Sequence, residues 1–347
     1  MNAIVIRGSG AARASGWLAA GLVVAAATLP WWGEPAWMRE FVEIACYFIF
    51  AMMWNLLAGY GGMVSVGQQA FLGLGGYVML SLGNFLGVNP FLAIPLAALV
   101  AALAALPVSR LAFRLQGGYF AIGTWVIAEV FRLSIANVPA VGGGSGTSLT
   151  ALRGMSRGMR ENTTYWVALA CVVVALALVY AFLRSKQGLA LQAIRDSEVA
   201  AESQGVDVAR LKLAVYVVAA FGCGMAGALY FVSAIRISPD AAFSVNWTAF
   251  AIFIVMIGGI GRLEGPIIGA LVFWALNKFF ADYGTWYQLG LGVLAVLMTL
   301  YFREGLGGFL HRRLGVELLP TRRILQSAGT PAATPPAPTL TLKETLR

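Results

Sequence analysis

The sequence has few charged residues, and this scarcity excludes most soluble proteins. Asp, Glu, Lys and Arg make up 11% of the 347 residues, whereas hydrophobic residues make up 59%. A soluble globular domain carries about 25% charged residues, which it needs to cover its surface. A membrane-spanning helix needs about 20 apolar residues, so this length can hold roughly ten spans. We therefore expect an all-α polytopic membrane protein.

Histidine and cysteine are also scarce, which excludes most metal and redox chemistry. The single histidine, His311, lies near the C-terminal end. Each of the three cysteines, Cys46, Cys171 and Cys223, lies inside an apolar run and has no partner at metal-ligand spacing. We interpret the cysteines as small buried apolar side chains. We expect no metal, no disulfide framework and no cofactor.

The chain also lacks the glycine-rich loop that cradles nucleotide phosphates. No lysine completes the pattern Gly-x-x-x-x-Gly-Lys-Ser/Thr. The lysines are Lys186, Lys212, Lys278 and Lys343. The chain therefore cannot hydrolyse ATP by that route, and if it pumps, the energy comes from a partner. We expect no catalytic residues.

Ten apolar runs are candidates for membrane-spanning helices. They cover residues 17–32, 41–58, 66–87, 90–109, 118–138, 164–183, 212–234, 247–261, 266–283 and 285–302. A cleaved signal peptide is the alternative for the first run, but Trp31 and Trp32 are typical of an interfacial aromatic belt. Ten spans could divide into two inverted halves of five helices, as in many transporters.

The distribution of Lys and Arg predicts the topology. With the N-terminus inside, most of the 24 basic residues fall in inner segments, as the positive-inside rule requires. The outer loop 139–162, with its three arginines, is the exception. The net charge of +9 therefore needs no nucleic acid to explain it. We expect a cytoplasmic N-terminal segment (1–16), a transmembrane domain (17–303) and a cytoplasmic, largely disordered, Pro-rich tail (304–347).

Polar side chains interrupt the apolar segment 55–77, among several glycines. Burying an unpaired amide costs roughly 2–7 kcal/mol, so these side chains must face protein or a wet cavity. Helices interrupted by glycine at membrane depth point to a substrate route, and hydrogen bonds between helices are the alternative reading. The candidate path residues are Asn55, Ser65, Gln68, Gln69 and Phe71.

The longest inner loop, 184–212, is polar, helix-prone and mixed in charge. Its acidic residues argue against a purely lipid-binding patch. A short amphipathic helix in this loop can dock into a groove on a cytoplasmic partner, and an ordinary solvated loop is the alternative. Four glycine clusters, at 59–62, 73–76, 222–227 and 258–261, predict close helix packing or helix breaks. Pro266 predicts the start of a new helix after a tight inner turn.

Glu129 and Arg132 are charged residues inside a predicted span. They are three positions apart and hence on one helical face. Each alone would cost about 2.5–3.5 kcal/mol at mid-membrane, so we expect a mutual ion pair with Arg132 reaching toward the outer interface. Proton coupling by Glu129 is the alternative and would make the chain a stand-alone secondary carrier. The nearby predicted spans offer no histidine or second acid for that role.

Four segments together resemble the permease subunits of bacterial ABC-type branched-chain amino-acid importers, in the LivM-like branch. The segments are 55–77, 117–149, 188–213 and 258–270, the last reading GGIGRLEGPIIGA. The resemblance implies a multi-pass permease of the cell inner membrane that translocates branched-chain or related amino acids with energy from separate ATPase subunits. Similar permeases carry urea and short amides, so the substrate class stays open.

The resemblance also implies partners. These are two cytoplasmic ATP-binding subunits, a second permease chain (LivH-like, or a second copy of this one), a periplasmic substrate-binding protein and membrane lipids. The loop would be the coupling segment that touches the ATPase, because Ala200, Ala201 and Gly205 resemble the Ala-Ala-x-x-x-Gly core of such loops. Val199 stands where glutamate is usual. The implied coupling residues are Arg195, Asp196, Glu198, Ala200, Ala201, Glu202 and Gly205.

Overall fold

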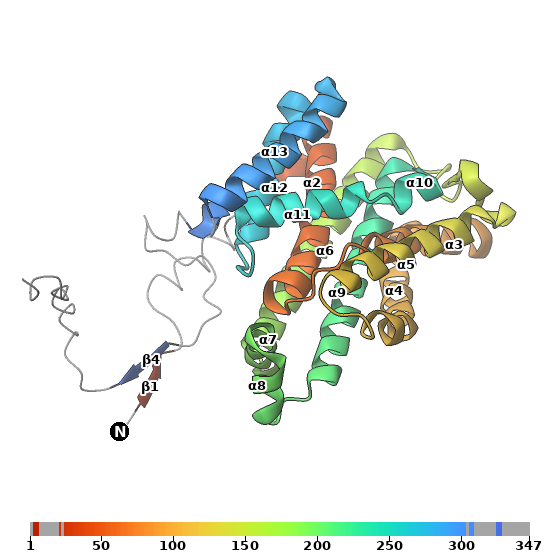
Figure 1. The fold of residues 1–347 in the computed structure, drawn as a ribbon. Helices are drawn as coiled ribbons and strands as arrows, with labels where there is room; N and C mark the ends of the chain where they lie inside the picture. Colours follow the sequence, from red (N-terminus) through yellow and green to blue (C-terminus); the bar gives the residue numbers. More distant parts are fainter. Residues whose placement is uncertain (1–2, 7–20, 22–23, 303–304, 309–323, 328–347) are drawn as a thin grey trace, which may run out of the picture.

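The computed structural model describes residues 3–6, 21, 24–302, 305–308 and 324–327, and helices account for nearly all of its regular structure (Figure 1). The helices are α2 (Pro35–Trp54), α3 (Gln69–Leu86), α4 (Pro90–Ala112), α5 (Gly118–Ala136), α6 (Arg157–Arg184), α7 (Lys186–Asp196), α8 (Glu198–Ser203), α9 (Val208–Ala234), α10 (Pro239–Ala242), α11 (Asn246–Gly258), α12 (Gly265–Phe280) and α13 (Thr285–Tyr301). A π-helical segment, η1 (Asn55–Tyr60), continues α2.

Two short antiparallel strand pairs complete the described elements. β1 (Ala3–Ile6) pairs with β4 (Ile324–Ser327), and β2 (Thr147–Ser148) pairs with β3 (Arg236–Ile237). The first pair joins segments from the two ends of the chain (Figure 1). Most of the predicted N-terminal segment and most of the predicted tail lie outside the described residues.

Eight helical segments within the described residues are long and apolar enough to cross a membrane, which confirms a helical polytopic membrane protein. The predicted number was ten. α12 has 16 residues, slightly fewer than the 17–25 or so that span a bilayer. Residues 17–20, 22 and 23 of the first predicted run, 17–32, lie outside the described residues, whereas residues 24–32 are helical.

α2 and α9 form the centre of the bundle. In each of them 78% of the most apolar stretch is buried, compared with 17% in α5 and 12% in the segment that contains α13. α9 packs against α2, α3 and α4, while α2 also packs against α6 and α11. α5 and α13 therefore present their apolar side chains outward, as helices do that face lipid or another membrane protein.

Glycines allow α3 and α9 to pack with their backbones almost in contact. A Cβ atom on Gly227 would lie 1.9 Å from the carbonyl oxygen of Leu72, and one on Gly75 would lie 2.1 Å from that of Gly224. Small residues at helix contacts have this function in membranes, where close van der Waals packing replaces the hydrophobic effect. The predictions for the glycine clusters at 73–76 and 222–227 are confirmed.

Two interruptions separate helices near the C-terminal end of α2. The first, residues 61–68, lies between η1 and α3 and begins where Gly62 adopts a φ of +69°. The second, residues 259–264, lies between α11 and α12, and Gly261 has a φ of +71°. Glycine adopts this left-handed conformation without steric cost. Pro266 lies in the first turn of α12, as predicted.

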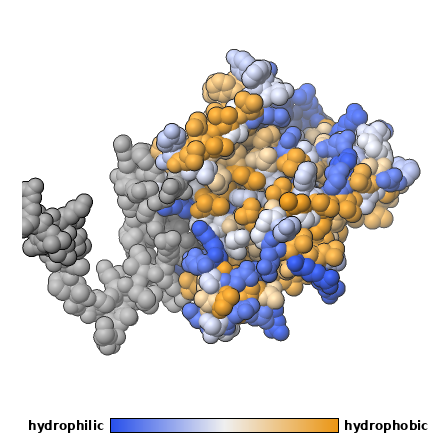
Figure 2. Space-filling model, viewed as in Figure 1, coloured by the Kyte–Doolittle hydropathy of each residue, from blue (hydrophilic) through white to orange (hydrophobic). Residues whose placement is uncertain are grey.

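The predicted loop 184–212 folds into α7 and α8. Gly205, with a φ of +82°, follows α8, and the Val206 N–H closes the turn on the Ala201 carbonyl at 3.1 Å. Figure 2 shows hydrophobic side chains across the middle of the visible face and hydrophilic side chains along its lower edge, where α7 and α8 lie in Figure 1. The segment therefore stands at a polar end of the bundle.

Candidate functional site

Gln68 and Gln69 lie at the start of α3 and are completely buried. Gln68 Oε1 accepts a hydrogen bond from Cys223 Sγ at 3.5 Å, and Gln69 Oε1 accepts one from Thr248 Oγ1 at 2.5 Å. Neither Nε2 group has a partner among the described residues. A buried donor without a partner costs about 1–3 kcal/mol, so these two donors single out the start of α3 as a candidate polar site.

Ser65 and Phe71 flank the two glutamines and are also completely buried. Ser65 Oγ accepts a hydrogen bond from the Gly67 N–H at 3.2 Å, and the Ser65 carbonyl accepts one from Trp54 Nε1 at 2.8 Å. The Phe71 ring meets the Tyr216 ring edge-on, with the centroids 5.5 Å apart. Ser65 therefore shapes the interruption before α3, while the Phe71 ring packs against Tyr216 of α9 in the first turn of α3.

Asn55 joins the two helix interruptions. Its Nδ2 donates to the Arg262 carbonyl at 2.8 Å, and its Oδ1 accepts from the Gly261 N–H at 2.9 Å. Both ends of this buried amide are thus bonded to the turn between α11 and α12. Asn55 fixes the end of α2–η1 against that turn, and it holds two segments that are about 200 residues apart in the sequence.

The residues predicted for coupling divide into one buried anchor and an exposed surface. Ala201 is 1% exposed and belongs to the hydrophobic core. The exposed members are Arg195, Asp196, Glu198, Ala200, Glu202 and Gly205. Glu198 pairs with Lys212 of α9, and the next residue, Val199, is 78% exposed, although it is apolar.

The structure adds several residues that sequence reasoning missed. Thr248 and Cys223 hold the glutamine carbonyls, and Thr124 Oγ1 accepts a hydrogen bond from the Val66 N–H at 3.1 Å. Each lies alone in a long apolar run, where one small polar side chain forms no pattern. Their roles follow only from the packing of α5, α9 and α11 around the start of α3.

Comparison with known protein families identifies the class of protein that has these helices and buried amides. Residues 39–302 match the family described as "Branched-chain amino acid transport system / permease component". The chain belongs to this family. The match covers the glutamine site, both helix interruptions and α7–α8, and it confirms the resemblance found in the sequence.

The permease is similar to several relatives along most of its length. It is 30% identical to the "High-affinity branched-chain amino acid transport system permease protein LivM" of Salmonella typhimurium over 298 residues, which is 77% of this chain and 70% of the relative. The LivM protein of Escherichia coli K12 matches to the same extent. A "Probable branched-chain amino acid transport permease protein LivM" of Methanocaldococcus jannaschii is 28% identical over 62% of this chain and 66% of its own length. No solved structure matches.

Membership of the family gives the permease its cellular role. It is the multi-pass membrane component of an ABC system for branched-chain amino acids in the bacterial inner membrane. It is a transport subunit without an ATPase site of its own, and the family implies ATPase subunits as partners.

The predicted Glu129–Arg132 pair is confirmed and extends to a third residue. Arg132 lies 2.5 Å from Glu129 and also donates to Asp240 Oδ1 at 2.6 Å, which links α5 to α10. Among the charged groups described in this region, the guanidinium therefore bridges two carboxylates. The Glu129 carboxylate is bound by Arg132, and such an ion pair is typical of a structural role.

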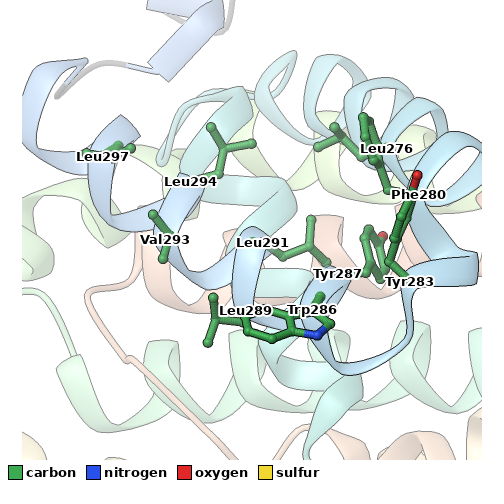
Figure 3. A pocket seen from close by; sticks show the side chains of 11 residues that line it. Leu276, Phe280, Tyr283, Trp286, Tyr287, Leu289, Leu291, Val293, Leu294 and Leu297 are labelled. Carbon is green, nitrogen blue, oxygen red and sulfur yellow. The ribbon is translucent and has the colours of Figure 1, made fainter.

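An open groove of about 640 Å³ lies on another face of the permease, along α12 and α13 (Figure 3). Its wall consists of aromatic and aliphatic side chains, among them Phe280, Trp286, Leu291 and Leu294. A site that orients an amino acid needs a few well-placed polar groups among the apolar ones. This apolar groove suits contact with acyl chains and is not a candidate for the substrate path.

Proposed function

We propose that this permease moves branched-chain amino acids along a path lined by Gln68, Gln69 and Phe71, with Asn55 and Ser65 shaping the helix interruptions beside it. The observation that carries this proposal is the pair of completely buried glutamines whose Nε2 groups have no partner among the described residues. The carboxylate of an amino acid accepts hydrogen bonds from amide donors. Its aliphatic side chain fits the aromatic surface of Phe71 and Tyr216.

The charge of the buried interior supports the same substrate class. The buried polar residues of the described chain are Asn55, Ser65, Gln68, Gln69, Ser109, Thr124, Thr164, Thr248 and Glu264. Glu264 alone in this set is ionisable, and it lies in the turn before α12. A zwitterion with no net charge would meet donors and acceptors at the glutamines but no fixed charge that traps or repels it.

The path assignment is tested by replacing both amides. We expect the double variant Gln68→Leu/Gln69→Leu to lose about tenfold or more of leucine uptake, because the donors to the carboxylate are gone. The assay is uptake of labelled leucine by proteoliposomes that hold the permease, its ATPase subunits and its substrate-binding protein. Gln288→Leu on the exposed face of α13 is the control and should transport normally. Unchanged uptake in the double variant would remove both glutamines from the path.

α7–α8 is the surface that receives an ATP-binding subunit in this proposal, and two such subunits serve the complete transporter. Two features support it. The segment is polar and mostly exposed, and it carries the apolar Val199, 78% exposed, on a six-residue helix. An exposed apolar side chain in a polar rim is typical of a protein contact. Ala201, buried beneath it, fixes α8 to the bundle.

The docking surface is tested by placing a charge on it. We expect Val199→Lys to weaken co-purification of the ATP-binding subunits, since the lysine must be desolvated in the contact. Val245→Lys is the matched control. Val245 precedes the N-terminal end of α11, whereas the turn that meets α7 follows the C-terminal end of that helix. Equal recovery of the ATP-binding subunits with Val199→Lys and with the unchanged permease would contradict this docking site.

A periplasmic substrate-binding protein and a second, LivH-like permease chain complete the proposed transporter. At the end of α2 opposite η1, a small pocket of about 240 Å³ is lined by Arg39, Arg157 and Arg160, with Glu161 bonded to Arg39 and Arg157. Its excess of positive charge supports an acidic partner on that side. The exposed apolar face of α5 supports contact with a second permease chain or with membrane lipids.

We infer a cytoplasmic position for both termini. The pairing of β1 with β4 supports termini on one side of the membrane. Residues 1–16 would form a cytoplasmic segment, 17–303 the permease domain with two inverted halves, and 304–347 a cytoplasmic tail. Single cysteines introduced at both ends should resist a membrane-impermeant thiol reagent in intact cells, and labelling from outside would contradict the topology.

A further inference from the structure

Arg195, in the last turn of α7, reaches away from the surface where the ATP-binding subunit is proposed to dock. The residue as a whole is exposed, but its Nη1 donates a hydrogen bond to the Gly59 carbonyl of η1 at 2.6 Å. Carbonyl groups in the last turn of a helix have no partner within the helix. They also form the negative end of its dipole, where a cation is favourable. The guanidinium thus binds the C-terminal end of α2–η1.

The turn between α11 and α12 lies against the contact between Arg195 and Gly59. A Cβ atom on Gly59 would lie 2.6 Å from the Gly261 N, and one on Gly261 would lie 2.7 Å from Arg195 Nη1. Two backbones and the Arg195 side chain therefore meet at this point because Gly59 and Gly261 have no side chains. Asn55, bonded to Gly261 and Arg262, holds η1 and the turn together beside it.

This junction connects with the interior of the bundle in two directions. α2, which ends at the junction through η1, is one of the two most buried helices, and it packs against α6, α9 and α11. The non-helical residues that follow η1 lead directly to Gln68 and Gln69 at the start of α3. A displacement of Gly59 therefore changes the position of a central helix and of the segment that carries the glutamine amides.

We propose that Arg195 transmits motion of α7–α8 to the translocation path and is not itself a contact of the ATP-binding subunit. It is a positioning residue: it holds the coupling segment to the ends of α2–η1 and α11 through the Gly59 carbonyl and the Gly261 backbone. This inference rests on the proposed role of α7–α8 and assigns it a physical connection to the membrane interior. Without that bond the ATPase can still bind and cycle, but its movement no longer reaches the path.

The test is the ratio of ATP hydrolysed to leucine imported in proteoliposomes that hold the complete transporter. We expect Arg195→Gln to keep its ATP-binding subunits and its ATP hydrolysis, while uptake falls about tenfold or more because a charge-assisted hydrogen bond is lost. Arg195→Lys retains a charge and a donor and should recover a large part of the uptake. Arg210→Gln is the matched control, since Arg210 lies in the first turn of α9, directly after the segment, and its side chain is 89% exposed.

Three results would overturn the inference. They are normal uptake with Arg195→Gln, loss of the ATP-binding subunits from an Arg195→Gln permease that is otherwise folded, and an Arg195→Lys variant no better than Arg195→Gln. Folding is checked by the detergent unfolding transition of each variant. Failure of the unchanged transporter to couple ATP hydrolysis to uptake would instead refute the proposed function, so the two failures are distinguishable.

Discussion

Replacing Asn55 by alanine should destabilise the permease by an amount that its two hydrogen bonds define. The substitution removes the bond from Nδ2 to the Arg262 carbonyl at 2.8 Å and the bond from the Gly261 N–H to Oδ1 at 2.9 Å. Hydrogen bonds between helices in membrane proteins contribute about 0.6 kcal/mol on average and about 1.7 at most. Two of them give roughly 1–3 kcal/mol, which is about fivefold to 150-fold in the unfolding equilibrium.

The measurement is the apparent free energy of unfolding of the purified permease, titrated with dodecyl sulfate in mixed micelles. Asn137→Ala is the control, because Asn137 is exposed and its Nδ2 bonds, within the described part of the chain, to the Leu133 carbonyl of the preceding helical turn. We expect that control to change the free energy by less than about 0.5 kcal/mol. If the free energy of unfolding of Asn55→Ala equals that of the Asn137→Ala control, the amide of Asn55 does not join the two helix interruptions.

Further substitutions test the packing and the charges of the bundle. Gly227→Val should prevent α3 and α9 from packing and reduce the yield of folded permease, because a Cβ there lies 1.9 Å from the Leu72 oxygen. Gly292→Val on α13 is the control, since a Cβ at that position meets open space. Equal yields of the two variants would contradict this. Asp240→Asn should lower the free energy of unfolding by less than about 1 kcal/mol, and less at high salt, since the Asp240 side chain is 76% exposed; a larger, salt-independent loss would contradict it.

The sequence predicted the class of the fold well because the bilayer imposes a simple rule. Long apolar runs with few charges must be helices, since no other single segment satisfies its own backbone in lipid. The same rule could not predict that α12 would be short, or that α2 would continue into the π-helical η1 at Asn55, because neither feature changes the apolar pattern of the sequence. The predicted number of spans was therefore too high for the described residues.

The sequence indicated which residues belong to the candidate site, but it did not indicate which residues they contact. Gln68 and Gln69 were conspicuous because amides in an apolar segment need a reason to be there. Their partners Cys223 and Thr248 come from helices more than 150 residues away, and no local pattern indicates them. Arg195 shows the same limit, because a charged residue in a polar loop gives no sign that it bonds to the Gly59 carbonyl.

The central claim is that this permease moves its substrate only when ATP-binding subunits act on α7–α8. The most direct measurement compares leucine accumulation by proteoliposomes that hold the permease subunits alone with accumulation by those that hold the complete transporter, both supplied with ATP and the substrate-binding protein. We predict accumulation against a gradient only with the complete transporter, and a loss of accumulation when ATP is withdrawn. Accumulation of leucine by the permease subunits alone would contradict the account.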